Sequence, residues 1–218
     1  MSAAKRSIDA LLALAPVLPL LTVEDVASAV SATRALVRGG LLAVEVTLRT
    51  PAALDAIAAI RREVPDALPG AGTVLTPEQL TDAARAGAAF IVSPGSTPRM
   101  LDAVRADTLP WLPGVATASE LMLGLEAGLT TFKLFPAASA GIALLRAWHG
   151  PFPQARFCPT GGIDAGNAPE WLALANVSCV GGSWIASPAA IAAGDWAGIE
   201  SRARLAASLA RAVKARAE

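Results

Sequence analysis

The sequence predicts an α/β fold, a (β/α)8 (TIM) barrel with a short N-terminal helix. The chain has 218 residues, close to the roughly 250 that such a barrel typically contains. Apolar residues make up 54% of it and charged residues only 17%, which suits a parallel sheet covered by helices. Strand-like apolar runs alternate with Ala-rich helical segments along the whole length, and this strict alternation excludes a sandwich or a helix bundle.

Eight apolar runs are the predicted strands, and a helical stretch follows each of them. The strands are expected at residues 17–21, 42–46, 68–72, 90–93, 111–113, 131–135, 156–159 and 177–181. The helices are expected near residues 24–38, 51–62, 76–86, 97–105, 118–127, 140–148, 165–174 and 199–216. Eight units give roughly 27 residues per unit, which is typical of a barrel, whereas an open doubly wound sheet seldom needs eight regular units. No linker or low-complexity segment divides the chain, so we expect one domain over residues 1–218.

The apolar stretch over residues 8–23 has some likeness to a secretory leader. However, Asp9 interrupts it, and Pro16 and Pro19 break it. A short amphipathic helix followed by a strand is therefore the better interpretation. No run is long and uniform enough to cross a bilayer, so we expect no membrane association and a cytoplasmic protein.

Charge and metal-ligand content exclude two further classes of function. Lys and Arg together number 18, as do Asp and Glu, and no long basic block occurs, so nucleic-acid binding has no electrostatic footprint. The single His and the two cysteines match no metal spacing, and we expect neither a metal nor a cofactor. Cys158 and Cys179 lie in apolar runs and are expected to be buried thiols, as in a reducing cytoplasm.

Threonine–proline pairs mark three of the predicted helix starts. Thr50, Thr76 and Thr97 each precede a proline, which places an N-cap residue before a proline at the first helical position. Thr76 and Gln79 also form a capping-box pattern.

Lys133 is the first candidate for chemistry, because catalytic groups of such barrels project from the C-terminal ends of strands. It lies between Phe132 and Leu134, where a charged amine is costly to desolvate, and a neutral amine is what attack on a ketone requires. The other two lysines, Lys5 and Lys214, lie near the termini. We predict a nucleophile, with a structural lysine that extends to solvent at the barrel rim as the alternative.

Glu45 and Arg49 lie at the end of the second apolar run. A carboxylate inside an apolar strand must be paired or neutral. The functional interpretation makes Glu45 a general base and Arg49 a nearby anion-binding group. The alternative is a buried Glu45–Arg49 ion pair that holds the strand end.

Glycine turns end the seventh and eighth runs. They comprise Thr160, Gly161, Gly162, Gly181, Gly182 and Ser183. Glycine lets backbone N–H groups approach an anion closely, and the loops after these two strands are a frequent phosphate site in barrels. Residues 70–73 and 93–95 follow the third and fourth runs, and they either line a pocket beside a carboxylate or serve as turns.

Taken together, these motifs resemble the 2-keto-3-deoxy-6-phosphogluconate (KDPG) aldolases, which are also called 4-hydroxy-2-oxoglutarate (KHG) aldolases. The likeness runs in order over nearly the whole chain. It rests on residues 45–50, 70–75, 93–95, 132–137, 157–163 and 181–184. The stretches around Lys133 and Thr160 are the most specific. Residues 137–141 depart from the family pattern, so no role is carried over to them.

The resemblance implies a homotrimeric class I aldolase of the Entner–Doudoroff pathway. Its substrate would be a phosphorylated keto acid, KDPG, which it splits into pyruvate and glyceraldehyde 3-phosphate, and it would also act on 4-hydroxy-2-oxoglutarate. Lys133 would be the Schiff-base lysine and Glu45 the general acid and base. The implied substrate-binding residues are Arg49 and Thr73 at the carboxylate, Pro94 and Phe135 lining the site, and the two glycine turns at the phosphate.

Three other functions stay open on the sequence. The 2-keto-3-deoxy-6-phosphogalactonate aldolases are the nearest, although they tend to differ at residues 47–50 and to lack the motif at residues 157–159. A phosphosugar isomerase or epimerase barrel would keep the glycine turns and form no imine, so it would be insensitive to borohydride. A non-catalytic phosphosugar-binding barrel would be stabilised by its ligand without turnover.

Overall fold

The computed structural model describes residues 7–106 and 109–214. Within them, the strands are β1 (Val17–Leu21), β2 (Ala43–Thr47), β3 (Leu68–Gly72), β4 (Ile91–Val92), β5 (Trp111–Leu112), β6 (Gly114–Val115), β7 (Thr131–Leu134), β8 (Arg156–Pro159) and β9 (Val180–Gly182). The helices are α1 (Ile8–Leu12), α2 (Val26–Arg38), α3 (Ala53–Glu63), α4 (Pro77–Arg85), α5 (Pro98–Ala106), α6 (Ala118–Glu126), α7 (Ala137–Ala140), α8 (Ile142–Trp148), α9 (Ala168–Leu172), α10 (Pro188–Ala192) and α11 (Trp196–Lys214).

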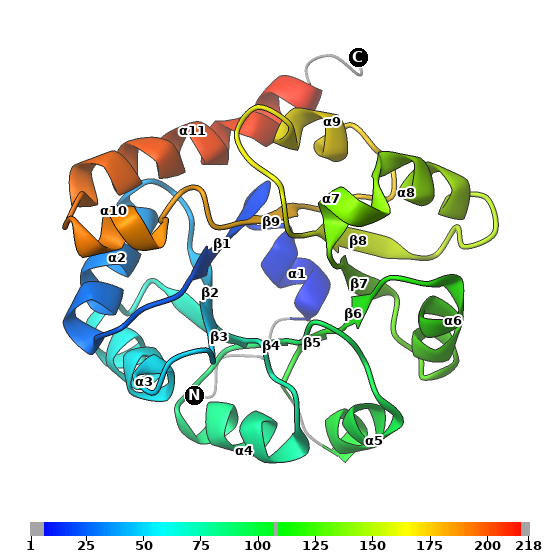
Figure 1. Ribbon diagram of the computed structural model, residues 1–218, viewed down its shortest axis with the longest axis horizontal. Helices are drawn as coiled ribbons and strands as arrows, with labels where there is room; N and C mark the ends of the chain where they lie inside the picture. Colours follow the sequence, from blue (N-terminus) through cyan, green and yellow to red (C-terminus); the bar gives the residue numbers. More distant parts are fainter. Residues whose placement is uncertain (1–6, 107–108, 215–218) are drawn as a thin grey trace.

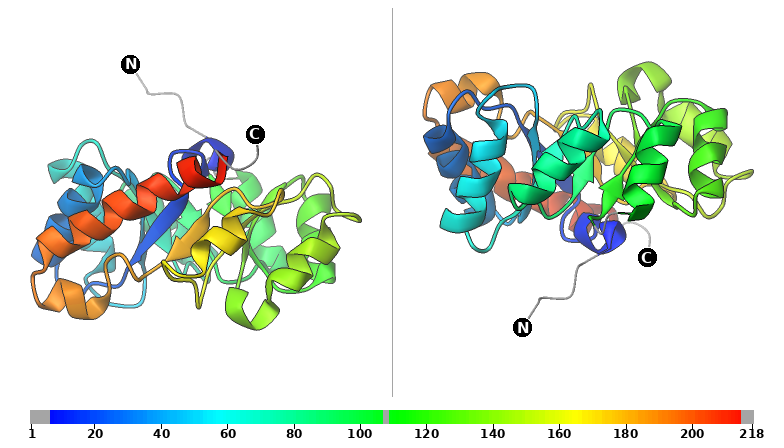
Figure 2. Two further views of the ribbon diagram at one scale, coloured as in Figure 1. Left: turned by 90° about the horizontal axis from the view of Figure 1, so that it is seen from above. Right: turned by 90° about the horizontal axis from the view of Figure 1, so that it is seen from below.

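The strands form a curled parallel sheet. One part has the order β5-β4-β3-β2-β1-β9 and the other the order β6-β7-β8. Pro113 alone separates β5 from β6, and isolated parallel bridges join Phe157 to Val177 and Thr160 to Gly181. Figure 1 shows the helices outside the strands and α1 in the middle of them. The side views place α1 at one end of the sheet (Figure 2).

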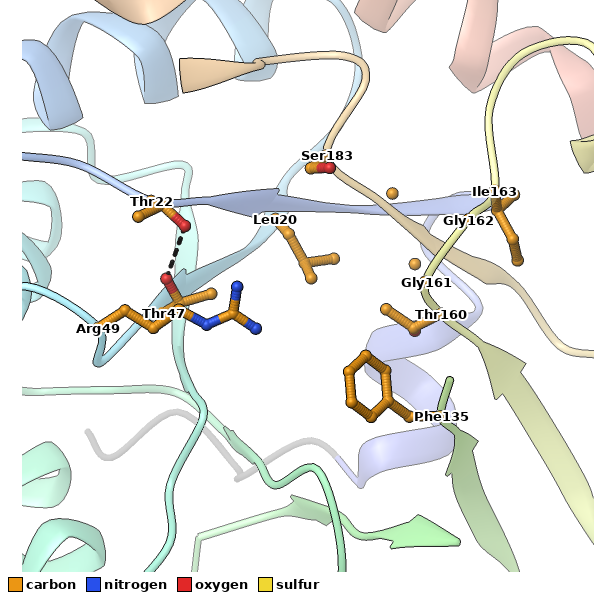
Figure 3. A pocket seen from close by; sticks show the side chains of 12 residues that line it. Leu20, Thr22, Thr47, Arg49, Phe135, Thr160, Gly161, Gly162, Ile163 and Ser183 are labelled. Carbon is orange, nitrogen blue, oxygen red and sulfur yellow. Dashed lines mark hydrogen bonds between the residues drawn. The ribbon is translucent and has the colours of Figure 1, made fainter. Parts of the chain in front are cut away.

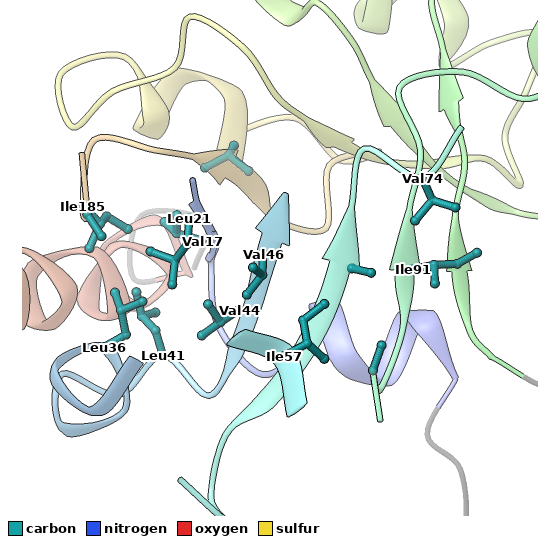
Figure 4. Packing of buried hydrophobic residues seen from close by; sticks show 14 of the residues in the cluster. Val17, Leu21, Leu36, Leu41, Val44, Val46, Ile57, Val74, Ile91 and Ile185 are labelled. Carbon is teal, nitrogen blue, oxygen red and sulfur yellow. The ribbon is translucent and has the colours of Figure 1, made fainter. Parts of the chain in front are cut away.

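Strand residues alternate between two hydrophobic clusters. In the larger one, Val44 and Val46 of β2 pack with Leu36 of α2 and Ile57 of α3, between the strands and the outer helices (Figure 4). The smaller cluster joins Leu11 and Leu12 of α1 to residues inside the curl, which are Leu18, Ala43, Phe90, Val92, Leu112, Cys158 and Cys179. Helix α1, the predicted short N-terminal helix, therefore packs against one end of the interior.

Three of the expected strands agree with the structure in both bounds. The strands predicted at residues 17–21, 68–72 and 156–159 have the same bounds as β1, β3 and β8. The helix expected near residues 140–148 is divided at Gly141, whose φ is 79°, and α10 was not expected. The last helix begins at Trp196 rather than at residue 199, and the expected positions 215–216 lie outside the described residues.

Two of the three predicted threonine caps are confirmed. Thr76 accepts a hydrogen bond from the Gln79 backbone N–H, and Thr97 accepts one from the Met100 backbone N–H. The prediction for Thr50 is wrong, because α3 begins at Ala53. The Thr50 hydroxyl instead donates to the Val23 carbonyl oxygen, 2.6 Å away.

In the parts of the chain described, no helix combines the length and the apolar character that crossing a membrane requires.

Candidate active site

Lys133 and Glu45 point into the curl of the sheet because their strand neighbours point outward. Phe132 and Leu134 belong to the cluster beneath the helices, and the Phe132 ring lies against Gly124 of α6, where a β-carbon would overlap it. Since successive side chains of a strand face opposite sides, Lys133 faces the interior. The same alternation between Val44 and Val46 turns Glu45 inward.

Inside the curl, these two side chains form a buried ion pair. Lys133 Nζ lies 3.4 Å from Glu45 Oε1, and the two side chains are only 6% and 1% exposed. The amine also lies 5.3 Å from the centroid of the Phe135 ring. Strand β7 carries Lys133 and β2 carries Glu45, and these strands belong to different parts of the sheet order. The pair therefore spans the interior and places an amine beside a proton acceptor.

Glu45 Oε2 is buried and has no hydrogen-bond partner among the described residues. Leaving a buried carboxylate oxygen unpaired is costly. The oxygen is therefore available to a substrate hydroxyl or to a water molecule that bridges to one.

Arg49 makes its contact with Thr73 and not with Glu45. Its Nε donates to Thr73 Oγ1 at 3.2 Å. Thr73 has a φ of 58°, which is rare for a β-branched residue. The alternative Glu45–Arg49 ion pair is wrong, since the carboxylate pairs with Lys133. The terminal guanidinium nitrogens of Arg49 have no hydrogen-bond partner within residues 7–106 and 109–214, so they can bind an anion.

A pocket lies at the C-terminal ends of the strands (Figure 3). Phe135, whose ring centroid is 5.3 Å from Lys133 Nζ, is one of the residues that line it. Its lining residues are Leu20, Thr22, Thr47, Arg49, Phe135, Thr160, Gly161, Gly162, Ile163, Gly181, Gly182 and Ser183. Figure 3 shows the Arg49 guanidinium reaching into it from one wall, with Phe135 and Thr160 opposite and Ser183 beyond them. Four of these lining residues were not predicted from the sequence: Leu20, Thr22, Thr47 and Ile163. For Thr47 a signal was present, because it lies two residues after Glu45 and so shares its face of β2.

The two glycine turns meet at one wall of the pocket. Gly161 and Gly162 have φ values of 97° and 75°, which only glycine adopts readily. A β-carbon on Gly181 would overlap Thr160 Oγ1, and Thr160 and Gly181 form a bridge. The structure therefore brings the two glycine turns side by side.

Four predicted site residues do not line this pocket: Lys133, Glu45, Thr73 and Pro94. Pro94 follows β4 in a turn where Ser93 Oγ donates to the Gly95 carbonyl oxygen at 2.6 Å. The backbone carbonyl of Pro94 lies against Gly114 of β6, leaving no room for a β-carbon there.

Both cysteines are buried free thiols, as predicted. Cys179 Sγ donates to Cys158 Sγ at 3.3 Å. This hydrogen bond, together with burial, raises the pKa of the Cys179 thiol well above its ordinary value. A protonated, buried thiol is a poor nucleophile, so Lys133 is the better candidate. Across the described ranges, no three or more His, Cys, Asp or Glu side chains gather as metal ligands.

Comparison with known proteins agrees with this geometry. A family model described as "KDPG and KHG aldolase" matches residues 8–202. The KHG/KDPG aldolase of Escherichia coli K12 is 50% identical over 201 residues, which cover 92% of this chain and 94% of that protein. The KDPG aldolase of Legionella pneumophila, solved with pyruvate captured at low pH as a covalent carbinolamine intermediate, has 46% identity and a TM-score of 0.92. That match covers 94% of this chain and all 100% of the other.

A structure of a protein named KDPGal is more distant. It has 26% identity and a TM-score of 0.81, with 92% of this chain and 96% of that chain covered.

Proposed function

This chain belongs to the KDPG and KHG aldolase family, and on that premise we propose that it cleaves KDPG into pyruvate and glyceraldehyde 3-phosphate through a Schiff base on Lys133. The observation that carries the proposal is the buried pair, in which Lys133 Nζ lies 3.4 Å from Glu45 Oε1. The alternative, a structural lysine that extends to solvent at the barrel rim, is not supported, since the Lys133 side chain is only 6% exposed. The carbinolamine captured in the Legionella pneumophila enzyme supports an amine as the attacking group.

Covalent attachment comes first. The Lys133 amine, in its neutral form, attacks the C2 ketone carbon of KDPG and forms a carbinolamine. The proton that Lys133 gives to Glu45 when the amine becomes neutral then passes to the carbinolamine hydroxyl. That hydroxyl leaves as water, and an iminium cation and the Glu45 carboxylate remain. This cation accepts the electron pair of the bond that breaks next, so the cleavage avoids a free carbanion.

Carbon–carbon cleavage then requires a base. Glu45 takes the proton of the C4 hydroxyl, the C3–C4 electron pair moves toward the iminium, and glyceraldehyde 3-phosphate leaves. Glu45 returns the proton to C3 of the enamine, and hydrolysis of the resulting iminium releases pyruvate and restores Lys133. Proton transfers of this kind contribute typically about 10²–10⁴-fold to the rate.

The ends of the substrate are both anionic, and the site offers separate groups for them. Arg49, held by Thr73, binds the keto-acid carboxylate. The backbone N–H groups of the two glycine turns and the Ser183 hydroxyl bind the phosphate. Phe135 and Pro94 form walls beside the reacting carbons. These roles follow the family motifs and the placement of the residues at the strand ends.

An assay of pyruvate release tests the proposal and its nearest alternative. Purified protein is given KDPG, its galactonate-derived C4 epimer and 4-hydroxy-2-oxoglutarate. We expect the highest kcat/KM with KDPG and measurable cleavage of 4-hydroxy-2-oxoglutarate, since identity is 50% to a KHG/KDPG aldolase and 26% to the KDPGal protein. A higher kcat/KM with the galactonate-derived substrate would contradict the assignment. Isomerisation of a phosphosugar without pyruvate release would contradict the reaction class.

The proposal also covers the closure of the barrel, the number of domains and the number of subunits. We infer a closed (β/α)8 barrel, which the bridges between β8 and the β9 segment support, and a single domain over residues 1–218. We also propose a homotrimer that acts in the cytoplasm in the Entner–Doudoroff pathway, using no metal or cofactor. Light scattering of the purified protein should give three times the mass of one chain, and a monomeric mass would contradict the trimer.

A further inference from the structure

Two threonine hydroxyls at the pocket wall have no part in the mechanism above. Thr22 directly follows β1, and Thr47 is the last residue of β2. These neighbouring strands pair Leu21 with Val46, so the next step along both strands brings Thr22 beside Thr47. Their Oγ1 atoms lie 2.9 Å apart, as the dashed line in Figure 3 shows. Both residues line the pocket.

This hydroxyl pair keeps hydrogen-bonding capacity for a ligand. Two hydroxyl groups carry two donor hydrogens, and the bond between them uses one. Among the residues described, neither side-chain oxygen has a second hydrogen-bonding partner. One hydrogen therefore remains for a group in the pocket, and both oxygens can still accept.

The position of the hydroxyl pair along β2 can be given relative to Glu45. Thr47 shares the inward face of β2 with Glu45, two residues earlier. A strand rises roughly 3.3 Å per residue, so Thr47 lies roughly 6–7 Å nearer the C-terminal end of the strand than Glu45. The glycine turns form another wall of the same pocket. A substrate that reaches those turns enters the pocket that the hydroxyl pair lines.

The chemistry of the pair matches one group of the substrate. The carboxylate and the phosphate of KDPG have cationic or N–H partners, and Glu45 takes the C4 hydroxyl. The C5 hydroxyl is the remaining polar group between C4 and the phosphate. A neutral hydroxyl that both donates and accepts is complementary to a pair of neutral hydroxyls. In 4-hydroxy-2-oxoglutarate, C5 is a carboxylate and carries no such group.

We propose that the Thr22–Thr47 pair binds the C5 hydroxyl of KDPG and thereby raises the preference of the site for the sugar-derived substrate over the short keto acid. This inference rests on the aldolase function proposed above. It makes Thr22 and Thr47 determinants of specificity and leaves imine formation to Lys133.

The test is the ratio of kcat/KM for KDPG to kcat/KM for 4-hydroxy-2-oxoglutarate. Thr22→Val and Thr47→Val keep the shape of the side chain and remove a hydroxyl. Each should lower the ratio by about threefold to tenfold, the loss of one hydrogen bond. Thr22→Ser should keep the wild-type ratio. The galactonate-derived substrate has the same C5 centre, so its kcat/KM should fall together with that of KDPG.

Thr50→Val is the matched control, because the Thr50 hydroxyl also joins the segment after β2 to the segment after β1 through Val23 but does not line the pocket. It should leave the ratio unchanged. An unchanged ratio in both valine variants at the pair, or an equal fall in Thr50→Val, overturns the inference.

All variants are also treated with pyruvate and borohydride. If the wild-type protein gives no adduct, the proposed aldolase function fails. If the adduct forms normally and the ratio does not move, only the binding of the C5 hydroxyl fails.

Discussion

Gly72 of β3 lies so close to the carboxylate of Glu45 that a β-carbon at Gly72 would overlap Glu45 Oε1. The glycine therefore makes the space in which the carboxylate reaches Lys133. Any other residue at position 72 must displace the far end of the Glu45 side chain, which is flexible, rather than the backbone. The position of the carboxylate thus depends on a residue that has no side chain.

Gly72→Ala should lower kcat with KDPG toward the level of Glu45→Gln, a loss of up to about 10²–10⁴-fold. The reason is that the carboxylate moves away from the protons it must transfer. The borohydride adduct with pyruvate should still form, because Lys133 is unchanged. Gly150→Ala is the control, since a β-carbon at Gly150 meets nothing within 4 Å. A Gly72→Ala protein with wild-type kcat would show that the position of Glu45 is not limiting.

Arg49→Lys should raise KM for KDPG by roughly 10- to 100-fold, the loss of a charge-assisted hydrogen bond. Arg49 uses Nε on Thr73 and keeps two terminal nitrogens for a carboxylate, whereas a lysine offers one point charge. Steady-state kinetics with KDPG separates KM from kcat. Thr73→Ser retains the hydroxyl that accepts from Nε and should change KM far less. A fall in kcat with an unchanged KM would assign Arg49 a role in catalysis instead.

The two buried thiols should resist modification in the folded protein. The hydrogen bond to Cys158 and burial raise the pKa of Cys179 above its ordinary value of 9.0, and the thiolate is the reactive form. Titration with a thiol reagent at pH 8 should therefore detect no fast-reacting cysteine until denaturant is added. Rapid reaction of the native protein would show that the interior opens readily.

The raised pKa of Cys179 also predicts how the free energy of unfolding changes with pH. The folded state holds the Cys179 proton more tightly than the unfolded state does, so this contribution is fully present below pH 9. It is lost as pH rises from the ordinary value of 9.0 toward the folded-state pKa. Denaturant titrations of the wild-type protein should show a steeper loss of stability above pH 9 than those of Cys179→Ala. Parallel losses in the two proteins would contradict the assignment.

Much of the fold could be predicted from the local sequence. Where an element could not be predicted, there is a physical reason for it. Strand β3 was predicted with the right bounds because its apolar run has clear ends. Helix α10, with five residues, is too short to show a helical period. The Thr50 cap failed because the hydroxyl binds Val23 O, a tertiary contact.

The candidate site, like the fold, could be predicted from the sequence only in part. The ends of the predicted strands made Lys133, Glu45 and Arg49 the candidates, since barrels place their chemistry there. The choice of partner for Glu45 could not be made locally. Arg49 is four residues away, and Lys133 is 88 residues away, yet the carboxylate pairs with Lys133. Only the curl of the sheet, which brings β2 opposite β7, decides between them.

In the proposed mechanism, the Lys133 amine carries the covalent intermediate. The protein is incubated with pyruvate, reduced with borohydride, digested and mapped by mass spectrometry, in parallel with Lys133→Ala. We predict one reduced adduct on the peptide that contains Lys133, and neither adduct nor KDPG cleavage in the variant. An adduct on Lys5 or Lys214, or no adduct in a protein that still cleaves KDPG, would contradict the account.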